Sequence, residues 1–358
     1  MPSNRLEDGR GHFSLLVDDR GGDGGDLLAE VAESFSRVHS SGLKSSPHQA
    51  SLTPFHHSFQ RKTRWVNTTF HHSPGNRKSK NHLYRMGSSN YWNDPYSTEN
   101  SSALGATVTS QGIISLRLHS GIQVDTTIDK GIRVLNSQSQ IIISLSPDGN
   151  SASLIHPSGL VYAYGSRVEI TTTDPTTGNT KFAKMFYKGV SFTSDTSALV
   201  YLVDQAGTRT TSDTFSDLSG DFSIPVFLHN AHYGSHMVRE CKKICSQTQY
   251  WITEDGTENW VVNGIRVSQT ADGLVRVGRG TSKYQIRTSP TNGTATITTP
   301  SVHSTASMGI PSTSSSSSGP HLFVKRGERR LHSDGLTFIV RNAGHASGFD
   351  EFNQLKVY

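Results

Sequence analysis

The residues best suited to chemistry are three histidines and two cysteines that fall within 17 positions of one another. Zinc takes four ligands drawn from imidazole and thiolate, often from closely spaced pairs. Cys241 and Cys245 are four residues apart, so on a helix both sulfurs would share one face. One hypothesis is therefore a zinc site. The five candidates are His229, His232, His236, Cys241 and Cys245, and the set best matched to four ligands is His232, His236, Cys241 and Cys245.

The alternative is a pair of structural cysteines without metal. The chain has 17 histidines, so their presence near a cysteine carries little weight, and free cysteine commonly packs as a small hydrophobic residue. The histidines also precede the cysteines, which matches no standard zinc finger. We expect no cofactor, with zinc as the open alternative.

Catalytic motifs are absent from the sequence. A thiolate beside an imidazole can act as a nucleophile, but neither cysteine has a flanking nucleophile signature. The chain contains no nucleophile elbow, no phosphate-binding loop and no paired-histidine zinc-protease motif. Asp204, Asp213 and Asp217 fall at strand ends or turns, where aspartate is favoured structurally. We therefore expect a protein that is not an enzyme.

Basic side chains interleaved with aromatic ones mark residues 39–93. This segment has eight basic and no acidic residues, whereas residues 1–38 have four basic and eight acidic ones. Cations suit phosphates and flat rings suit unstacked bases, so the segment is a candidate for nucleic acid or another partner. The alternatives are a nuclear import signal at Arg77-Lys78-Ser79-Lys80 and a solvated linker. A shorter basic stretch at residues 325–330 could contact nucleic acid or an acidic protein, serve as an import signal, or be a solvated hairpin tip. The candidate binding residues are Arg61, Lys62, Arg64, Arg77, Lys78, Lys80, Arg85, Lys325, Arg326, Arg329 and Arg330.

Apolar residues at helical spacing follow Asp26, which suits a helix N-terminus. A helix over residues 26–38 would place them on one face, but a helix this short is marginal alone. Its apolar face would bind either a groove of a partner or this protein's own domain. The residues of that face are Leu27, Leu28, Val31, Phe35 and Val38.

The elements that must position these groups are short β-strands. Between residues 112 and 299, runs of β-branched and apolar residues alternate with turns such as Pro147-Asp148-Gly149 and Asn263-Gly264. Glycine adopts positive φ without steric cost, and this makes such turns hairpin connections. The pattern predicts a mainly β fold, an antiparallel meander arranged as a sandwich or barrel. Trp251, Trp260 and Tyr284 are its expected large core residues.

Composition divides the chain into an arm, a β-rich module and a tail. Residues 1–102 are expected to form a largely disordered arm. The β-rich module covers residues 103–302, with two β subdomains at 103–212 and 247–302 around a short helical insert at 213–246. A serine-rich linker at 303–320 precedes a C-terminal hairpin and tail at 321–358, in which residues 321–324 and 336–340 pair.

Composition also narrows the protein class. Hydrophobic residues make up 33% of the chain, below the 45–50% typical of globular domains, which indicates one folded unit diluted by disordered segments. Residues 1–20 lack a signal-peptide pattern, and no run of about 18 apolar residues occurs. Two cysteines are too few for a secreted disulfide scaffold. We expect an intracellular protein of the cytoplasm, the nucleus or both, neither secreted nor bound to membranes.

Two functions remain open at this point. The first is a scaffold or adaptor that binds other proteins, because a meander offers edge strands to an extended peptide. The second is a nucleic-acid-binding or chromatin-associated protein that uses residues 39–93 and 321–342. The sequence specifies no oligomeric state.

Overall fold

The computed structural model of the protein describes residues 105–280, 283–309 and 319–358. All of them belong to one compact unit, residues 77–358. The predicted helix at 26–38 and the basic segment at 39–93 lie outside the described residues, so both stay predictions. Within the described part of the chain, no helix is long and apolar enough to span a membrane.

Twelve antiparallel strands form the first sheet, sheet A, in which sequence neighbours are also spatial neighbours. Glycines with positive φ lie in many of the connections, as hairpin turns require. A short 3-10 helix, η1 (His119–Gly121), connects β2 and β3. The strands are β1 (Ala106–Val108), β2 (Ile114–Arg117), β3 (Ile122–Thr126), β4 (Ile132–Asn136), β5 (Ile141–Leu145), β6 (Ser151–His156), β7 (Gly159–Tyr164), β8 (Arg167–Thr173), β9 (Thr180–Phe186), β10 (Gly189–Ser194), β11 (Val200–Asp204) and β12 (Gly207–Thr211).

A second sheet, sheet B, repeats this topology with twelve further strands in sequence order. The strands are β13 (Gln249–Ile252), β14 (Glu258–Val262), β15 (Ile265–Gln269), β16 (Val275–Arg279), β17 (Tyr284–Thr288), β18 (Ala295–Thr298), β19 (His303–Ser307), β20 (His321–Arg326), β21 (Arg329–Ser333), β22 (Phe338–Asn342), β23 (His345–Phe349) and β24 (Leu355–Val357).

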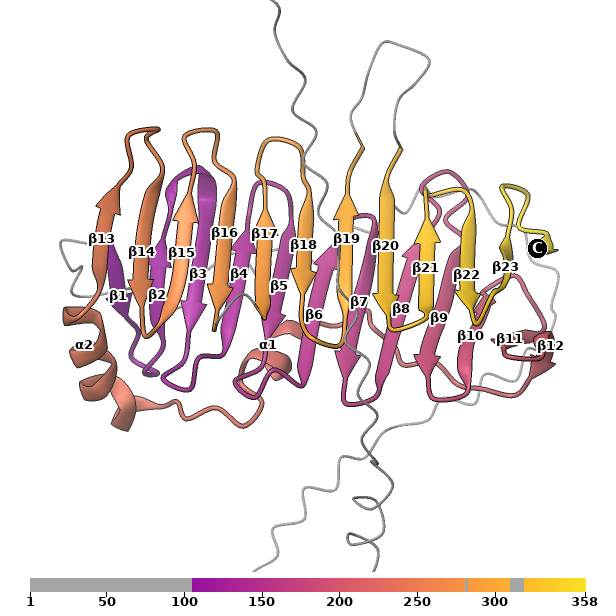
Figure 1. Cartoon of the computed structure of the whole chain (residues 1–358), viewed down its shortest axis with the longest axis horizontal. Helices are drawn as coiled ribbons and strands as arrows, with labels where there is room; N and C mark the ends of the chain where they lie inside the picture. Colours follow the sequence, from indigo (N-terminus) through magenta and orange to yellow (C-terminus); the bar gives the residue numbers. More distant parts are fainter. Residues whose placement is uncertain (1–104, 281–282, 310–318) are drawn as a thin grey trace, which may run out of the picture. The chain divides into compact units, whose positions relative to one another are not determined.

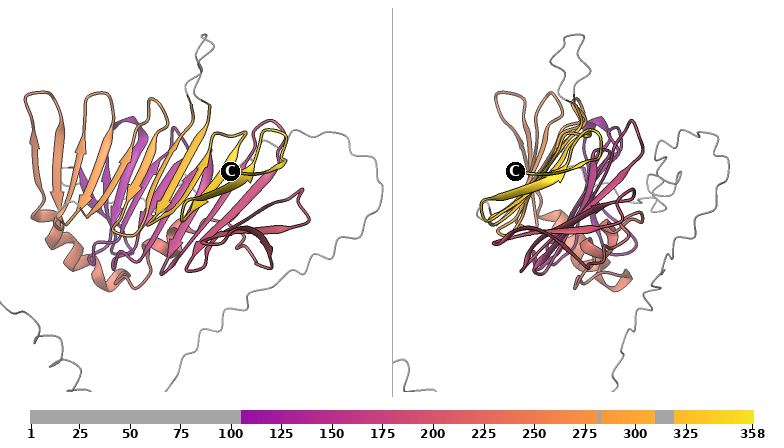
Figure 2. Two further views of the ribbon diagram at one scale, coloured as in Figure 1. Left: turned by 45° about the vertical axis from the view of Figure 1, so that its right-hand side comes forward. Right: turned by 90° about the vertical axis from the view of Figure 1, so that its right-hand side faces the viewer.

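The two sheets pack face to face, and their inner faces form the core (Figures 1 and 2). Side chains alternate between the faces: in β16, Val275 and Val277 are buried and Arg276 is exposed. One continuous cluster of buried residues includes Phe192 of sheet A and Phe338 of sheet B. The predicted antiparallel meander with two β parts is confirmed, and its form is a sandwich.

Strands of equal rank in the two sheets lie opposite each other. Strand β6 contacts β18, β10 contacts β22, and β11 contacts β23. Both sheets therefore start at the same end of the sandwich. Between β12 and β13 the chain must travel back about 50 Å, the width of twelve strands spaced about 4.8 Å apart. We call this connection, residues 212–248, the return segment.

The return segment contains the helices of the insert: α1 (Ser223–Phe227), the 3-10 helix η2 (Ser235–Met237) and α2 (Val238–Ser246). Helix α2 buries Cys241 and Cys245 on one face and exposes Lys242 and Lys243 on the other. The predicted helical insert between two β parts is thereby confirmed. Figure 1 shows α2 at the end of the sandwich where β1 and β13, the first strands of the two sheets, lie.

The turn between β5 and β6 requires a glycine at position 149. Gly149 has a φ of +75°, and a Cβ at this position would collide with the ring of Tyr284 in sheet B. The same ring lies over the Arg279 guanidinium, 4.3 Å from the ring centroid. A hairpin turn of sheet A thus fits against a buried cation of sheet B.

The C-terminal region differs from the sequence-based expectation. Residues 321–324 and 336–340 do not pair, because β21 lies between β20 and β22. Gly327, with a φ of +56°, allows a tight turn directly after β20. On the other side, β20 pairs with β19 across the serine-rich segment. The described residues from 303 onward therefore continue sheet B instead of forming a separate hairpin.

Candidate functional site

The two cysteines of the predicted zinc set face the core of the sandwich. Helix α2 packs its buried face on β1. The Cys241 thiol donates to the carbonyl of Gly112, in the β1–β2 turn, at 3.1 Å, and Cys245 approaches the carbonyl of Thr107 in β1 at 4.0 Å. Burial raises the pKa of both thiols to about 11. Neutral thiols in apolar surroundings are poor metal ligands.

The two histidines of that set point elsewhere. Nδ1 of His232 lies 2.9 Å from the Asp129 carboxylate, and His236 is exposed in η2. Among the residues that the structure describes, no group of three or more histidine, cysteine or carboxylate side chains is placed to hold a metal ion. The structure does not bring the four predicted ligands together.

The basic stretch after residue 324 divides between two faces. Lys325 and Arg330 are exposed on the outer face of sheet B. Arg326 donates to the carbonyl of Gly165 at 3.0 Å and Arg329 to that of Tyr187 at 3.1 Å. Both carbonyls lie in hairpin turns of sheet A, β7–β8 and β9–β10. Strand alternation causes this division, because successive side chains point to opposite faces. Half of the predicted patch therefore joins the sheets, and half faces outward.

Among the residues that the structure describes, strand β13 pairs only with β14, so it is an open edge of sheet B. Thr253 donates its N–H to the Thr257 carbonyl at 3.0 Å, and Ile252 lies opposite Glu258. Hydrogen-bonded and non-hydrogen-bonded pairs alternate in an antiparallel ladder. The N–H and C=O groups of Tyr250 and Ile252 therefore point away from β14, toward the open edge.

Large side chains surround these free backbone groups. Trp251 is 38% exposed and Ile252 58% exposed. Tyr250 is anchored instead, with its ring centroid 5.3 Å from that of the buried Trp260 and its hydroxyl donating to Glu258 at 2.7 Å. The predicted core role is thus confirmed for Trp260 and wrong for Trp251, because Trp251 points outward from an edge strand.

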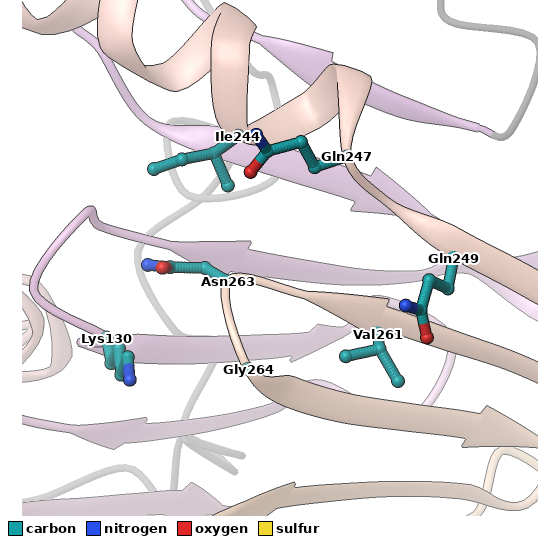
Figure 3. A pocket seen from close by; sticks show the side chains of 7 residues that line it. All are labelled: Lys130, Ile244, Gln247, Gln249, Val261, Asn263 and Gly264. Carbon is teal, nitrogen blue, oxygen red and sulfur yellow. The ribbon is translucent and has the colours of Figure 1, made fainter.

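A groove of about 310 Å³ lies beside the start of β13, between α2 and the turn that joins β14 to β15 (Figure 3). Ile244 and Val261 supply its apolar surface. Three amide side chains, Gln247, Gln249 and Asn263, border it, and amides both donate and accept hydrogen bonds. The groove's full lining is Lys130, Ile244, Gln247, Gln249, Val261, Asn263 and Gly264.

Asn263 has a structural part in shaping this groove. It follows β14 in a left-handed conformation, with a φ of 53°, as expected for the Asn263-Gly264 turn. Its amide donates to the carbonyl of Ile128 at 2.8 Å. The sheet B turn is thereby attached to the β3–β4 turn of sheet A, next to Lys130.

A family profile described as "Domain of unknown function (DUF8796)" matches residues 105–355. The chain belongs to this family. No curated protein matches the chain.

Two solved structures of a zebrafish (Danio rerio) protein are similar to the DUF8796 chain. The wild-type TCP10 domain of CPAP in complex with a peptide of STIL aligns at 10% identity with a TM-score of 0.21, covering 69% of this chain and 98% of that one. The wild-type TCP10 domain without the peptide aligns at 11% identity with a TM-score of 0.13, covering 69% and 88%.

The edge site of the DUF8796 domain was not found by sequence reasoning. The sequence predicted short strands throughout residues 112–299, but nothing within such a strand says whether it has one neighbour or two. The available signal was Trp251 next to Ile252, a pair whose side chains must point to opposite faces. Only one of these two large side chains could therefore point into the core of the sandwich.

Proposed function

We propose that the DUF8796 domain of this chain is a non-enzymatic protein-binding module that takes an extended peptide along β13. The observation that carries the proposal is the outward-pointing backbone of Tyr250 and Ile252, on an open edge bordered by a groove. Main-chain hydrogen bonds would give affinity and neighbouring pockets specificity, as in other strand-addition complexes. In the full chain, such a module would act as a scaffold or adaptor.

Of the four end strands of the two sheets, β13 is the best suited to a peptide. Helix α2 packs on β1, and β12 lies against β23 of the other sheet. Strand β24 is also open but has three residues, one fewer than β13. Only β13 combines free backbone groups with a groove and an exposed tryptophan.

The chemistry of the site defines the peptide. A four-residue edge pairs with an extended segment of similar length, and side chains of that segment alternate between the two faces of sheet B. Trp251 offers an apolar surface on the outer face and Ile252 one on the inner side. We therefore expect a peptide with apolar residues on both faces, its main chain also bonded by Gln247 and Gln249.

The groove is suited to binding and not to catalysis. Lys130 is the one lining side chain that titrates, and no carboxylate, imidazole or thiol accompanies it there. Acid–base or nucleophilic catalysis needs at least a positioned pair of such groups. A non-enzymatic role is accordingly part of the proposal.

The test uses the full chain and a proline at the open edge. Peptides are first selected against wild-type protein from a display library of random twelve-residue sequences, and their affinities are measured by fluorescence anisotropy. Ile252→Pro removes an N–H that points away from β14, so the β13–β14 ladder keeps its bonds. We expect at least tenfold weaker peptide binding.

The matched control is Leu355→Pro on the other open edge of sheet B. Tyr358 donates to the Ala346 carbonyl at 2.9 Å, so the Leu355 N–H likewise points outward. This variant should bind the peptides like wild type. Equal affinities for all three proteins, or a library that yields no binding peptide, would refute the proposal.

A further inference from the structure

The outer face of sheet B, turned toward the viewer in Figure 1, carries two groups of cations. Arg266, Arg276 and Arg287 are exposed on β15, β16 and β17; we call them the first cluster. Lys325, Arg330 and Arg341 are exposed on β20, β21 and β22; they form the second cluster. Six cations therefore lie on one side of one sheet.

The cations are neighbours across the strands. Arg276 lies directly opposite Arg287, and Arg330 lies between Lys325 and Arg341. Like charges directly opposite each other destabilise a sheet. Three such contacts on one face are unfavourable for folding alone, which indicates that the face is kept for an anionic ligand.

Acidic residues do not neutralise this face. Among the described residues of sheet B, Glu258 is the one acidic side chain on a strand; it takes an inner-face position opposite Gln269 and bonds Tyr250. The acids nearest the clusters, Asp272 and Glu328, lie in turns. A hydrogen bond from Thr270 is the main cause that lowers the pKa of Asp272, and the charge of Arg276 has a smaller effect in the same direction. Glu328 lies beside Arg330. Among the described residues, neither carboxylate forms an ion pair with a cation of the two clusters.

Small polar side chains separate the two clusters. Between them, β18 and β19 present Thr296, Thr298 and Thr305 outward. From β16 to β21 the distance is about 24 Å, five strand spacings of about 4.8 Å. A flexible polyanion can lie across such a strip and reach both clusters.

Aromatic rings lie next to the second cluster on the same face. The rings of His303 and Phe323 are 6.2 Å apart between centroids. Burial, with a smaller effect from Lys325, lowers the pKa of His303, so at pH 7 this imidazole is a neutral flat ring. Rings among cations suit unstacked bases, which an acidic peptide or a lipid headgroup lacks.

We propose that the outer face of sheet B binds single-stranded nucleic acid, with the chain of nucleotides running across β15–β22. The two cation clusters contact phosphates, and Phe323 and His303 stack on bases. A hollow of about 260 Å³ beside Arg330 and Arg341 gives one phosphate a recessed position, with the Glu328 carboxylate as the one acidic group of its lining. This surface is separate from the β13 edge, so it goes beyond the protein-binding role.

The test measures binding of a fluorescein-labelled twelve-nucleotide oligouridine to the full chain by anisotropy between 50 and 300 mM salt. The variant Arg276→Gln/Arg287→Gln/Arg330→Gln/Arg341→Gln removes four exposed cations. We expect at least thirtyfold weaker binding at 100 mM salt. The plot of log affinity against log salt should become less steep by about 3, because each of the four lost phosphate contacts contributes about 0.7 to the slope.

The matched control removes four exposed cations elsewhere: Lys188→Gln/Arg239→Gln/Lys242→Gln/Lys243→Gln. It should weaken binding less than threefold.

A further variant, Arg61→Gln/Lys62→Gln/Arg77→Gln/Lys78→Gln, measures how much the basic segment at 39–93 contributes to binding. Phe323→Leu keeps every charge and should weaken binding about tenfold through lost stacking, which separates recognition of bases from attraction of charge. Melting curves establish that each variant is folded.

Four outcomes would overturn the proposal: no binding at 50 mM salt, equal loss in the control, loss only in the 39–93 variant, or equally tight binding of a polyglutamate of the same charge. The last result would identify an acidic protein as the ligand. Failure here leaves the β13 edge untouched, since Ile252→Pro changes none of the cations.

Discussion

The two sheets share a topology and differ in what lies on their outer faces. Sheet A is crossed by the return segment: Phe215 contacts Phe182 of β9, Phe222 contacts Tyr162 of β7, and Ser223 bonds Arg133 of β4. Among the described residues, no such segment crosses the outer face of sheet B. A chain that builds two sheets from the same end must return once, and only one outer face receives the returning chain.

The outer-face residues agree with this difference. Beneath the return segment, sheet A has buried Leu135, Ile142 and Ile155, packed against Phe222. Its buried cation Lys184 contacts the Asp213 carboxylate of the return segment. Sheet B instead has exposed arginines and lysines next to one another. A covered face requires apolar contacts and paired charges, whereas an uncovered face can carry unpaired cations for a ligand.

The ion pair under the return segment should give the largest effect. Asp213→Ala leaves Lys184 buried without its carboxylate, and we expect a loss of about 4 kcal/mol in the free energy of unfolding. Urea denaturation at pH 7 measures it. Glu328→Ala, at an exposed turn of sheet B, is the matched control and should cost less than about 0.5 kcal/mol. Similar losses for the two would mean that the covering of sheet A contributes little.

Two isoleucines allow the same comparison for apolar packing. Ile142 of β5 is buried under the return segment, whereas Ile339 of β22 is partly exposed on the outer face of sheet B. Ile142→Ala should cost about 3 kcal/mol, and Ile339→Ala under about 1 kcal/mol. Equilibrium unfolding of both variants provides the difference, and equal costs would contradict an uncovered sheet B.

The interface shared by the sheets should respond to pH. Nε2–H of the buried His156 donates to the Gly293 carbonyl at 2.7 Å, and its Nδ1 accepts from the Ser158 N–H. Burial lowers the pKa of His156 from 6.5 to about 4. Between these values the unfolded chain binds more protons, so stability falls as pH falls through that window, by about 2 kcal/mol between pH 7.5 and pH 5.

His156→Gln serves as the reference for this pH dependence. Other groups titrate in both proteins, so the prediction concerns the difference between them, measured by unfolding at the two pH values. The loss on acidification should be smaller in the variant by about 2 kcal/mol. Parallel pH profiles would show that His156 is not the proton-linked group.

The smallest effect is expected from the cations themselves. Arg330→Gln relieves repulsion from Lys325 and Arg341, so it should leave stability unchanged or raise it by up to about 0.5 kcal/mol, more at low salt. Arg133→Gln on sheet A removes contacts to Asp221 and Ser223 and should cost about 1 kcal/mol. Calorimetric melting at two salt concentrations measures both, and a clear loss for Arg330→Gln would indicate a structural role.

Much of the local structure could be predicted from the sequence. The Asn263-Gly264 turn, the strands on its two sides and the helix that carries Cys241 are all present. Each depends on residues within a few positions, through φ preferences and side-chain alternation. The pairing of β20 was missed because the decisive turn at Gly327 competes with a longer loop that the sequence allows equally well.

The candidate sites were harder to predict than the strands. Side-chain alternation places Lys325 and Arg330 on one face of sheet B and Arg326 and Arg329 on the other. This division could be predicted only once the strand register was known. The proximity of Arg276 to Arg287, or of Arg330 to Arg341, depends on that register as well. The predicted zinc set failed to assemble because spacing along the chain says nothing about which way each side chain faces.

Residues close in sequence set the turns, the alternation and the helix of this protein, because backbone preference and the period of two act over a few residues. Tertiary structure alone made Trp251 an edge residue, placed Asp213 over Lys184 and left the cations of sheet B exposed within the described part of the chain. These features arise from contacts such as Nε2 of Gln269 to the carbonyl of His119 at 3.0 Å, made across 150 positions. Such contacts depend on how two separate meanders stack and on where the chain between them returns.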